Sequence, residues 1–161
     1  MEENLCVGCP GNCCSKKSGD KFVTKENIAE IEAAGYMRFY HKKKGSKFCV
    51  LNKRGDYCIF YDTQKNGCTI YNIRPADCRI FPYDTIMRDG KYFWILWEWE
   101  ENECVLRKCL DHEKHLEALE RDVIPKFAGY LGLYSMYTEE IIKTNKKKYR
   151  ILREIRFRGK Q

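Results

Sequence analysis

Residues 6–14 read CVGCPGNCC and place four thiols, those of Cys6, Cys9, Cys13 and Cys14, within nine residues. Two cysteines separated by two residues form a chelating hook, because the short loop turns both sulfurs inward and its glycines free backbone N–H groups to donate to them. Unligated thiols at this density would be prone to oxidation. The segment therefore predicts an irregular loop wrapped around a metal, with the rest of the fold built around that site.

Four further cysteines follow, separated by eight or nine residues: Cys49, Cys58, Cys68 and Cys78. Short β-prone segments at 48–51, 57–61 and 68–71 carry the first three, and the turn signals Gly55-Asp56 and Asn66-Gly67 separate these segments. We expect the cysteines at strand ends and turns, where successive strands bring them toward one point.

Residues 68–82 read CTIYNIRPADCRIFP. With the opening loop, this segment resembles the YkgJ-type cysteine-cluster family, which carries Cys-x2-Cys-x2–3-Cys-Cys and later Cys-x-Ile-Tyr-x2-Arg-Pro-x2-Cys-Arg-x-Phe/Tyr-Pro. The resemblance covers residues 6–83 and implies a small zinc- or iron-chelating domain, similar to the cluster-bearing region of flagellin lysine N-methylase. It implies these chelators: Cys6, Cys9, Cys13, Cys14, Cys58, Cys68 and Cys78.

The first motif departs from many relatives, because three residues rather than two precede the Cys13-Cys14 pair. Which of these two thiols points at the metal is left open. Cys49 lies outside the matched pattern, and its role is open as well.

Arg74 and Arg79 flank Cys78 and are candidate cofactor-binding residues. A four-thiolate iron–sulfur cluster carries net negative charge, which nearby guanidinium groups would stabilise. The alternative is that the two arginines pair with Asp77 or Asp84.

Cys104 and Cys109 are the last cysteines and are also predicted metal ligands, which complete the first site or form half of a second. His112 and His115 follow on one helix face, so a mixed Cys/His site is an alternative. Because this helix is acidic, solvent-facing histidines are the favoured interpretation.

Thiolates select zinc, Cu(I) or iron–sulfur, and spacing alone does not separate these. The adjacent Cys13-Cys14 pair, the surplus of thiols and the arginines near Cys78 favour a [4Fe–4S]-type cluster. Zinc closed in a tetrahedral site of four thiolates is the alternative.

The patterning predicts an α+β fold in a small single domain, with short strands and a β-hairpin around the metal site and helices covering it. Residues 83–88 and 91–99 read as the hairpin, with Asp89-Gly90 as its turn. Helices are expected at 25–34 after Thr24, at 112–121 after Asp111, at 123–132 and from Thr138 onward. Residues 149–157 fit a strand or a helix.

Hydrophobic residues make up 43% of the chain, enough for a core without covalent staples. Ten cysteines in 161 residues, about 6%, fall below the roughly 8–10% of small disulfide scaffolds. The acidic start MEEN lacks the basic and apolar regions of a signal peptide, and the longest apolar run, Tyr92–Trp97, is too short to cross a bilayer. We therefore expect a cytoplasmic protein with no membrane partner, whose thiols are reduced.

The net charge of +7 is concentrated at the C-terminus. Residues 137–161 contain 9 Lys+Arg against 3 Asp+Glu, whereas residues 1–136 contain 21 against 20. We therefore expect a cysteine-cluster metal-binding domain at 1–136 and a basic extension at 137–161. The extension is either a solvated face or a contact for nucleic acid.

Three functions remain open. The first is an iron–sulfur protein acting as a redox or accessory module with a protein partner. The second is a zinc-stabilised module whose basic C-terminus contacts nucleic acid. The third, a lysine methyltransferase-like activity, is implied by the resemblance alone. The sequence contains no GxGxxG, Walker or HExxH motif, and it leaves catalysis undecided.

Overall fold

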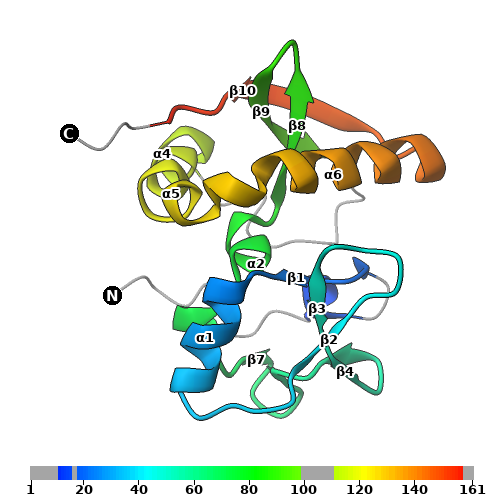
Figure 1. The fold of residues 1–161 in the computed structure, drawn as a ribbon, viewed down its shortest axis with the longest axis vertical. Helices are drawn as coiled ribbons and strands as arrows, with labels where there is room; N and C mark the ends of the chain where they lie inside the picture. The colour runs from blue at the N-terminus through cyan, green and yellow to red at the C-terminus, as the bar shows by residue number, and fades with distance from the viewer. Residues whose placement is uncertain (1–10, 16–17, 99–110, 158–161) are drawn as a thin grey trace. The chain divides into compact units, whose positions relative to one another are not determined.

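A computed structural model describes residues 11–15, 18–98 and 111–157 of the chain. These residues form two compact units, the first ending at Arg79 and the second beginning at Ile80 (Figure 1). Both units combine helices with antiparallel strands, which confirms the predicted α+β class. Among the described residues, no helix is both long and apolar enough to cross a bilayer.

The first unit contains a three-stranded antiparallel sheet in the order β1-β3-β2, formed by β1 (Phe22–Val23), β3 (Cys49–Leu51) and β2 (Tyr40–Lys42). Helix α1 (Lys25–Ala33) follows β1 and confirms the expected helix at 25–34. Its cap is reciprocal, because Thr24 Oγ1 accepts from the backbone N–H of Asn27 and the Asn27 side chain accepts from that of Thr24.

Two short strand pairs follow the sheet. Their strands are β4 (Lys53–Arg54) with β5 (Tyr57–Cys58), and β6 (Tyr61–Asp62) with β7 (Gly67–Cys68). The segment expected as one strand at 57–61 is divided between β5 and β6. The segment expected at 68–71 ends early, because the 3-10 helix η3 (Tyr71–Ile73) begins where the strand was predicted to continue.

A buried hydrophobic cluster forms the core of the first unit: Val23, Ile31, Phe39, Leu51, Phe60 and Ile70. Helix α2 (Ala76–Ile80) closes the unit, and the 3-10 helix η1 (Asn12–Cys14) opens its described part. Because strands of two or three residues have little stability of their own, this core and the groups around it must hold the loops in place.

The second unit is built on the predicted hairpin. Strands β8 (Tyr83–Arg88) and β9 (Lys91–Trp97) pair in register through a turn at Asp89 and Gly90, whose φ values of 50° and 76° are those of a type I′ turn. Trp94 and Trp97 of β9 are buried in the core of this unit. Trp99, at the expected end of the hairpin, lies outside the described residues.

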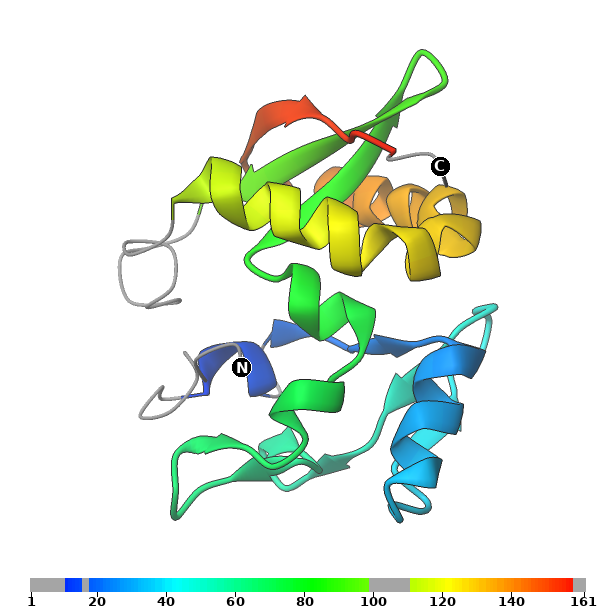
Figure 2. The ribbon, with the colours of Figure 1, turned by 90° about the vertical axis from the view of Figure 1, so that its left-hand side faces the viewer.

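The ambiguous segment after residue 148 is a strand. β10 (Tyr149–Glu154) pairs antiparallel with β9 and gives the sheet order β10-β9-β8, with an irregularity between Ile151 and Arg153 (Figure 2). Helix α6 (Leu131–Asn145) runs across the boundary predicted at residue 136 and packs against β8. Residues on both sides of that boundary therefore belong to one compact unit.

The remaining helices differ from expectation in two places, because the segment expected as one helix at 123–132 is divided among three elements and no helix begins at Thr138. α4 (His112–Asp122) begins after Asp111, whose Oδ1 accepts from the N–H of Lys114, as predicted. A short turn of helix, α5 (Ile124–Phe127), and the 3-10 helix η4 (Ala128–Tyr130) then lead into α6. The helix start predicted at Thr138 is wrong, because Thr138 lies inside α6. Its hydroxyl donates a hydrogen bond to Asp84 Oδ1 at 2.6 Å.

Glu120 of α4 is a buried carboxylate whose oxygens are fully engaged. It accepts hydrogen bonds from Trp94 Nε1 at 3.0 Å, from Arg153 Nη1 at 2.6 Å and Nη2 at 3.2 Å, and from the backbone N–H of Arg156 at 2.9 Å. Burial lowers the pKa of Arg153, but the carboxylates of Glu120 and then Glu113 outweigh this effect and raise the pKa above its ordinary value. This ion pair joins α4 to the strand contributed by the C-terminal segment.

We expect Glu120→Gln to lower the free energy of unfolding by about 2 kcal/mol, because it removes the buried counter-ion of the half-buried Arg153 guanidinium and leaves, among the described residues, only the exposed Glu113 to pair with it. Urea denaturation followed by tryptophan fluorescence measures this change, since Trp94 and Trp97 lie in the same unit. The matched control is Glu117→Gln, whose side chain is 42% exposed and lies 3.8 Å from Arg156, and for which we expect a change within about 0.5 kcal/mol. Equal changes in the two variants would contradict a structural role for the buried pair.

Candidate metal centre

The Cys13-Cys14 pair lies in a tight turn that requires glycine before it. Gly11 has φ of 72°, in the left-handed region, and its carbonyl accepts from the N–H of Cys14 at 2.8 Å. A Cβ at residue 11 would also collide with the Tyr61 ring. Any side chain here would therefore disturb both the turn and its packing on β6.

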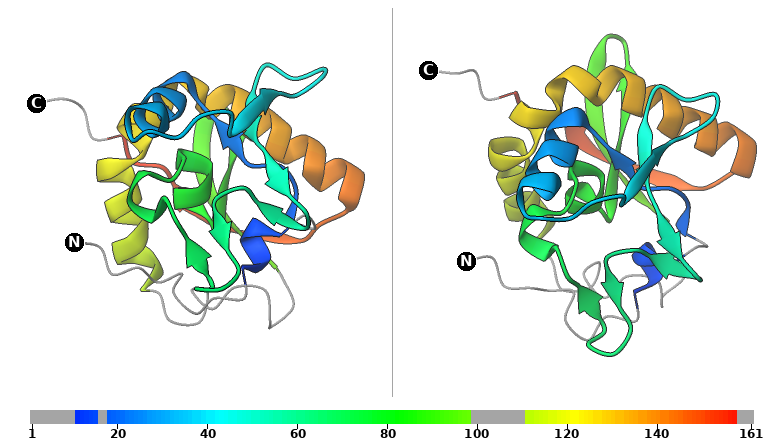
Figure 3. Two further views of the ribbon diagram at one scale, coloured as in Figure 1. Left: turned by 90° about the horizontal axis from the view of Figure 1, so that it is seen from below. Right: turned by 60° about the horizontal axis from the view of Figure 1, so that its bottom comes forward.

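An isolated antiparallel bridge between Ser15 and Tyr57 brings this turn beside the strand that carries Cys58. Figure 3 shows η1 next to the β4–β5 strand pair. The Tyr57 and Tyr61 rings stack with their centres 4.8 Å apart, and the Tyr61 ring in turn lies against Gly11 at the start of the turn. The first predicted thiol motif and the first cysteine of the second set are thus neighbours in the fold.

The other described cysteines come from separate elements of the first unit: Cys49 on β3, Cys58 on β5, Cys68 on β7 and Cys78 on α2. All four are partly buried and pack against the hydrophobic core of that unit. Cys49 differs in its setting, because it pairs with Val23 and Lys42 inside the three-stranded sheet.

Helix α2 is held in place by polar contacts at its first turn. The buried Asp77 side chain accepts from the backbone N–H of Phe22 at 2.8 Å, and Asn27 Oδ1 accepts from that of Ala76 at 3.4 Å. These contacts fix α2 to β1 and α1 and so determine where Cys78 lies. Pairing of the arginines with Asp77 was the alternative to a cluster-binding role, and one hydrogen bond of Asp77 goes to the backbone of Phe22.

The sulfurs of Cys13 and Cys14 are 4.0 Å apart and share a hydrogen bond. This hydrogen bond lowers the pKa of Cys13 to about 6 against the opposing effect of burial, with help from the charges of Lys21 and Arg74. The same bond, with burial and the neighbouring thiols, raises the pKa of Cys14. The hydrogen bond thus favours the thiolate at Cys13 and the thiol at Cys14.

Burial is the largest cause of the raised pKa values of Cys58 and Cys78, and nearby acidic groups add to it. Cys13 contributes at Cys58, while Asp77, Cys58 and Cys68 contribute at Cys78. Thiols bind metals as thiolates, and a cation supplies the charge that makes deprotonation favourable in such a setting. Thiols of this kind, here Cys13, Cys14, Cys58, Cys68 and Cys78, are the donor type that thiophilic metals select.

Three cations in the described part of the chain act on these thiols, and one of them, Lys53, lowers the pKa of Cys58. Lys21 lowers the pKa of Cys13 and partly offsets the rise at Cys58 and Cys78, and Arg74 lowers the pKa of Cys13. The Arg74 guanidinium carbon is 3.8 Å from the centre of the Tyr71 ring, which orients it. Lys21 was not among the candidates from the sequence, because it stands before β1 in no recognisable motif.

Arg79 lies in the last turn of α2 and is half-buried, and its backbone N–H donates to the carbonyl of Pro75 at 3.0 Å. Asp84, the other acid considered as an arginine partner, accepts from Thr138 and from Trp97 Nε1 in the second unit.

Cys6, Cys9, Cys104 and Cys109 lie outside the described residues. Within the described ranges, no group of three or more His, Cys, Asp or Glu side chains is arranged to hold a metal ion by itself.

His112 and His115 are half-buried rather than solvent-facing. His112 Nδ1 lies 2.6 Å from the hydroxyl of Tyr83, and the His115 ring lies 5.8 Å from the ring of Tyr83. His41 Nδ1 lies 2.7 Å from the side-chain oxygen of Asn52. Each of the three histidines thus has a protein contact within the described residues.

Comparison with known proteins points in the same direction as the thiols. The model of the CxxCxxCC family, described as "Putative zinc- or iron-chelating domain", matches residues 5–109. The "Uncharacterized protein MJ0661" of Methanocaldococcus jannaschii is 35% identical over 94 residues, which cover 53% of this chain and 48% of that relative. The match thus spans about half the length of that relative, and no solved structure matches the chain.

Asp77→Ala tests the contact that positions Cys78. It leaves the buried N–H of Phe22 without its acceptor, which costs about 1–3 kcal/mol, and we expect the metal-free protein to lose that much unfolding free energy. Asp77→Asn is the matched control, because its side-chain oxygen still accepts, and it should lose less than about 1 kcal/mol. Urea denaturation followed by circular dichroism measures both. An Asp77→Ala variant as stable as the parent would contradict the positioning role.

Proposed function

The chain belongs to the CxxCxxCC family of zinc- or iron-chelating domains, and from that premise we propose that its clustered cysteines hold an iron–sulfur cluster of the [4Fe–4S] type. The protein then acts as a redox or accessory module for a protein partner. When bound, such a cluster supplies one-electron chemistry that no side chain of this protein offers.

The number of interacting thiols carries the proposal. Five described cysteines lie in the first unit outside its three-stranded sheet: Cys58, Cys68 and Cys78 pack against one core, and Cys13 and Cys14, 4.0 Å apart, lie in the turn that is bridged to Tyr57. A structural zinc site uses four ligands, so five thiols exceed what one zinc ion needs. Cys6 and Cys9 precede the pair in sequence and add two more candidate ligands.

The surrounding cations support the same proposal. Lys21 and Arg74 act on Cys13, and Lys21 also acts on Cys58 and Cys78. A cluster with four thiolate ligands is negatively charged, so positive charges around it stabilise the reduced state. We propose that Cys58, Cys68, Cys78 and a thiol of the N-terminal loop bind the cluster, with Lys21 and Arg74 tuning its potential.

Zinc is the second candidate, and one distance favours it. Two thiolates on one tetrahedral zinc ion, with Zn–S bonds of about 2.3 Å, lie about 3.8 Å apart. The Cys13–Cys14 sulfur separation of 4.0 Å is close to that value. In this alternative the metal only stabilises the loops of the first unit.

The basic C-terminal segment is the candidate contact for nucleic acid in the zinc alternative. Two of its arginines are engaged in the fold, because Arg153 pairs with Glu120 and Arg156 lies 3.6 Å from Glu113. Exposed lysines at 146–148 are the cations best placed for such a contact. Methyl transfer rests on the resemblance to flagellin lysine N-methylase alone.

Anaerobic purification followed by metal and sulfide analysis distinguishes the two metals. We expect a brown protein with broad visible absorbance and with iron and acid-labile sulfide in comparable amounts. A colourless protein that carries zinc in their place would overturn the cluster proposal and leave the zinc alternative.

Cysteine variants test the ligand set in the same preparation. Cys78→Ser should lose bound metal and soluble yield together, because metal binding and folding are linked. Cys49→Ser, in the three-stranded sheet, is the matched control and should keep the metal content of the parent. A fully loaded and folded Cys78→Ser protein would remove Cys78 from the ligand set.

Charge variants test the proposed tuning. Lys21→Gln and Arg74→Gln should each make the midpoint potential of the cluster more negative, because removing a nearby cation makes electron uptake less favourable. Lys44→Gln, an exposed lysine of the same unit, should leave the potential unchanged. Protein-film voltammetry or dye-mediated titration measures the three shifts, and equal potentials in all three variants would contradict the assignment.

A further inference from the structure

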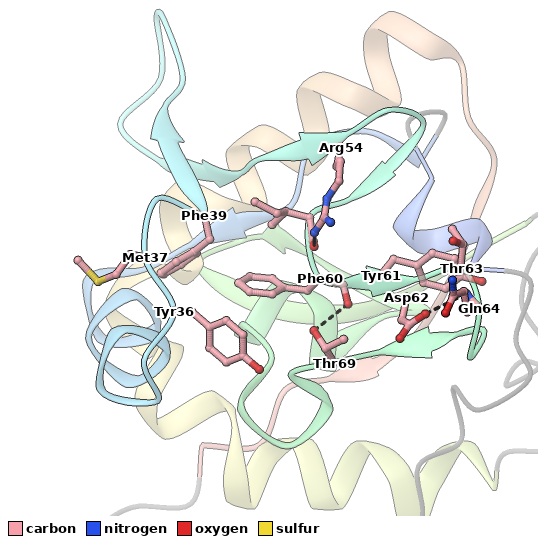
Figure 4. A pocket seen from close by; sticks show the side chains of 11 residues that line it. Tyr36, Met37, Phe39, Arg54, Phe60, Tyr61, Asp62, Thr63, Gln64 and Thr69 are labelled. Carbon is pink, nitrogen blue, oxygen red and sulfur yellow. Dashed lines mark hydrogen bonds between the residues drawn. The ribbon is translucent and has the colours of Figure 1, made fainter.

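The first unit contains an open pocket of about 600 Å³ that neither the cysteine cluster nor the family match explains. It is lined by Tyr36, Met37 and Phe39, by residues 59–64, and by Arg54 and Thr69. We call it the Met37 pocket. Figure 4 shows Tyr36, Phe39 and Phe60 gathered at one end, Tyr61 to Gln64 at the other, and Arg54 reaching in from above. Its volume lies in the range of ligand-binding sites.

Exposed apolar side chains are concentrated at this pocket. Met37 is 69% exposed and Tyr36 is 36% exposed, and no other large hydrophobic side chain in the described part of the first unit is as exposed. Behind them, Phe39 and Phe60 are buried, with ring centres 5.5 Å apart, and Tyr36 packs edge-on against Phe60 at 5.3 Å. Exposed methionine and tyrosine over a rigid aromatic floor are typical of surfaces that bind protein side chains.

Arg54 adds a positive charge to the pocket. One of its Nη groups donates to the carbonyl of Ile59 at 2.8 Å, and this bond fixes the guanidinium while leaving further N–H groups to donate. The one carboxylate in the lining, Asp62, accepts from the backbone N–H groups of Gln64 and Lys65, which lower its pKa. Asp62 thus accepts hydrogen bonds within its own turn, and Arg54 is suited to bind a carboxylate of another molecule.

The pocket adjoins the candidate metal centre along the chain. Ile59 follows Cys58 directly, and Thr69 follows Cys68. Tyr61 lies against Gly11, at the start of the turn that holds Cys13 and Cys14. A partner seated in the pocket would therefore contact residues that directly follow predicted ligands in the chain, and a tyrosine that lies against the turn carrying two more.

We propose that the Met37 pocket is the docking site for the protein partner of the metal centre, and the need for such a partner rests on the function proposed above. The occupant is a peptide segment of that partner. A bulky apolar or aromatic side chain inserts between Tyr36, Met37 and Phe60, and a nearby Asp or Glu of the segment binds Arg54.

A peptide fits this pocket better than single-stranded nucleic acid does. Nucleic-acid grooves place several cations along the backbone and offer ring faces for stacking. The pocket lining has one cation, Arg54, and one carboxylate, and two of its rings, Phe39 and Phe60, are buried. A flexible exposed methionine adapts to side chains of different shape, which suits a protein partner.

A displayed library of random peptides, selected on the purified full-length protein with its metal, tests the proposal. We expect enriched sequences to contain an aromatic or large aliphatic residue within three positions of an Asp or Glu. The most enriched peptide, synthesised with a fluorescent label, should bind about tenfold more weakly to Arg54→Gln and to Met37→Ser by fluorescence anisotropy. Arg54→Lys, which keeps the charge but not the fork of donors, should give an intermediate loss.

Matched controls come from the second unit. Arg150→Gln and Met136→Ser alter exposed residues of the same types, and Met136 is 63% exposed against 69% for Met37. Both control variants should bind the peptide like the parent. No enriched peptide, enriched sequences without acidic residues, or binding unchanged in Arg54→Gln and Met37→Ser would each overturn the proposal. A labelled single-stranded oligonucleotide that binds in an Arg54-dependent way while peptides do not would assign the pocket to nucleic acid instead.

Metal content, measured on every variant, separates this proposal from the proposed function. Loss of peptide binding in Arg54→Gln with iron and sulfide unchanged supports docking at the pocket. A protein that binds iron and sulfide but selects no peptide refutes the docking site and leaves the metal function intact. A protein without iron that still selects acidic–apolar peptides refutes the cluster and keeps the pocket as a peptide-binding site.

Discussion

The electrostatic cost of ionising thiols that are buried close together is the constraint that governs the chemistry of the first unit. Cys58 and Cys78 hold their protons because burial and neighbouring acidic groups oppose their ionisation. Their elements are short, since β5 has two residues and α2 has five, and such pieces gain little from their own hydrogen bonds. A metal that converts the thiols to ligands would therefore link the charge of the site directly to the order of the loops.

The second unit also buries an ionisable group, and there the opposite charge comes from another side chain of the protein. Glu120 is buried beside Trp94, and Arg153 supplies both the opposite charge and two hydrogen bonds. The sheet and its helices enclose a hydrophobic core of ordinary composition, which includes Ile86, Ile95 and Trp97. Each unit thus buries charge or potential charge: the second pairs it with protein groups, and the first carries its thiols in a chain of a zinc- or iron-chelating family.

Local sequence signals predicted those parts of the fold that depend on a few consecutive residues. The cap at Thr24, the cap at Asp111 and the turn at Asp89-Gly90 are of this kind, because the groups that satisfy each other lie within three residues. Thr138 carried the same kind of signal and was misread. Its hydroxyl contacts Asp84, 54 residues earlier, and a cap residue and a buried hydrogen-bonding threonine cannot be told apart from the local sequence.

The sequence by itself determined that cysteine thiols at chelating intervals, in a chain of the CxxCxxCC family, are the chemical feature of this protein. Only the tertiary structure decided which cations act on those thiols, that Arg153 serves Glu120 rather than an external anion, and that Met37 and Arg54 share a pocket. The reason is distance along the chain. Lys21 and Cys78, or Glu120 and Arg153, meet only because separate elements pack together, and such contacts leave no periodicity or spacing in the sequence.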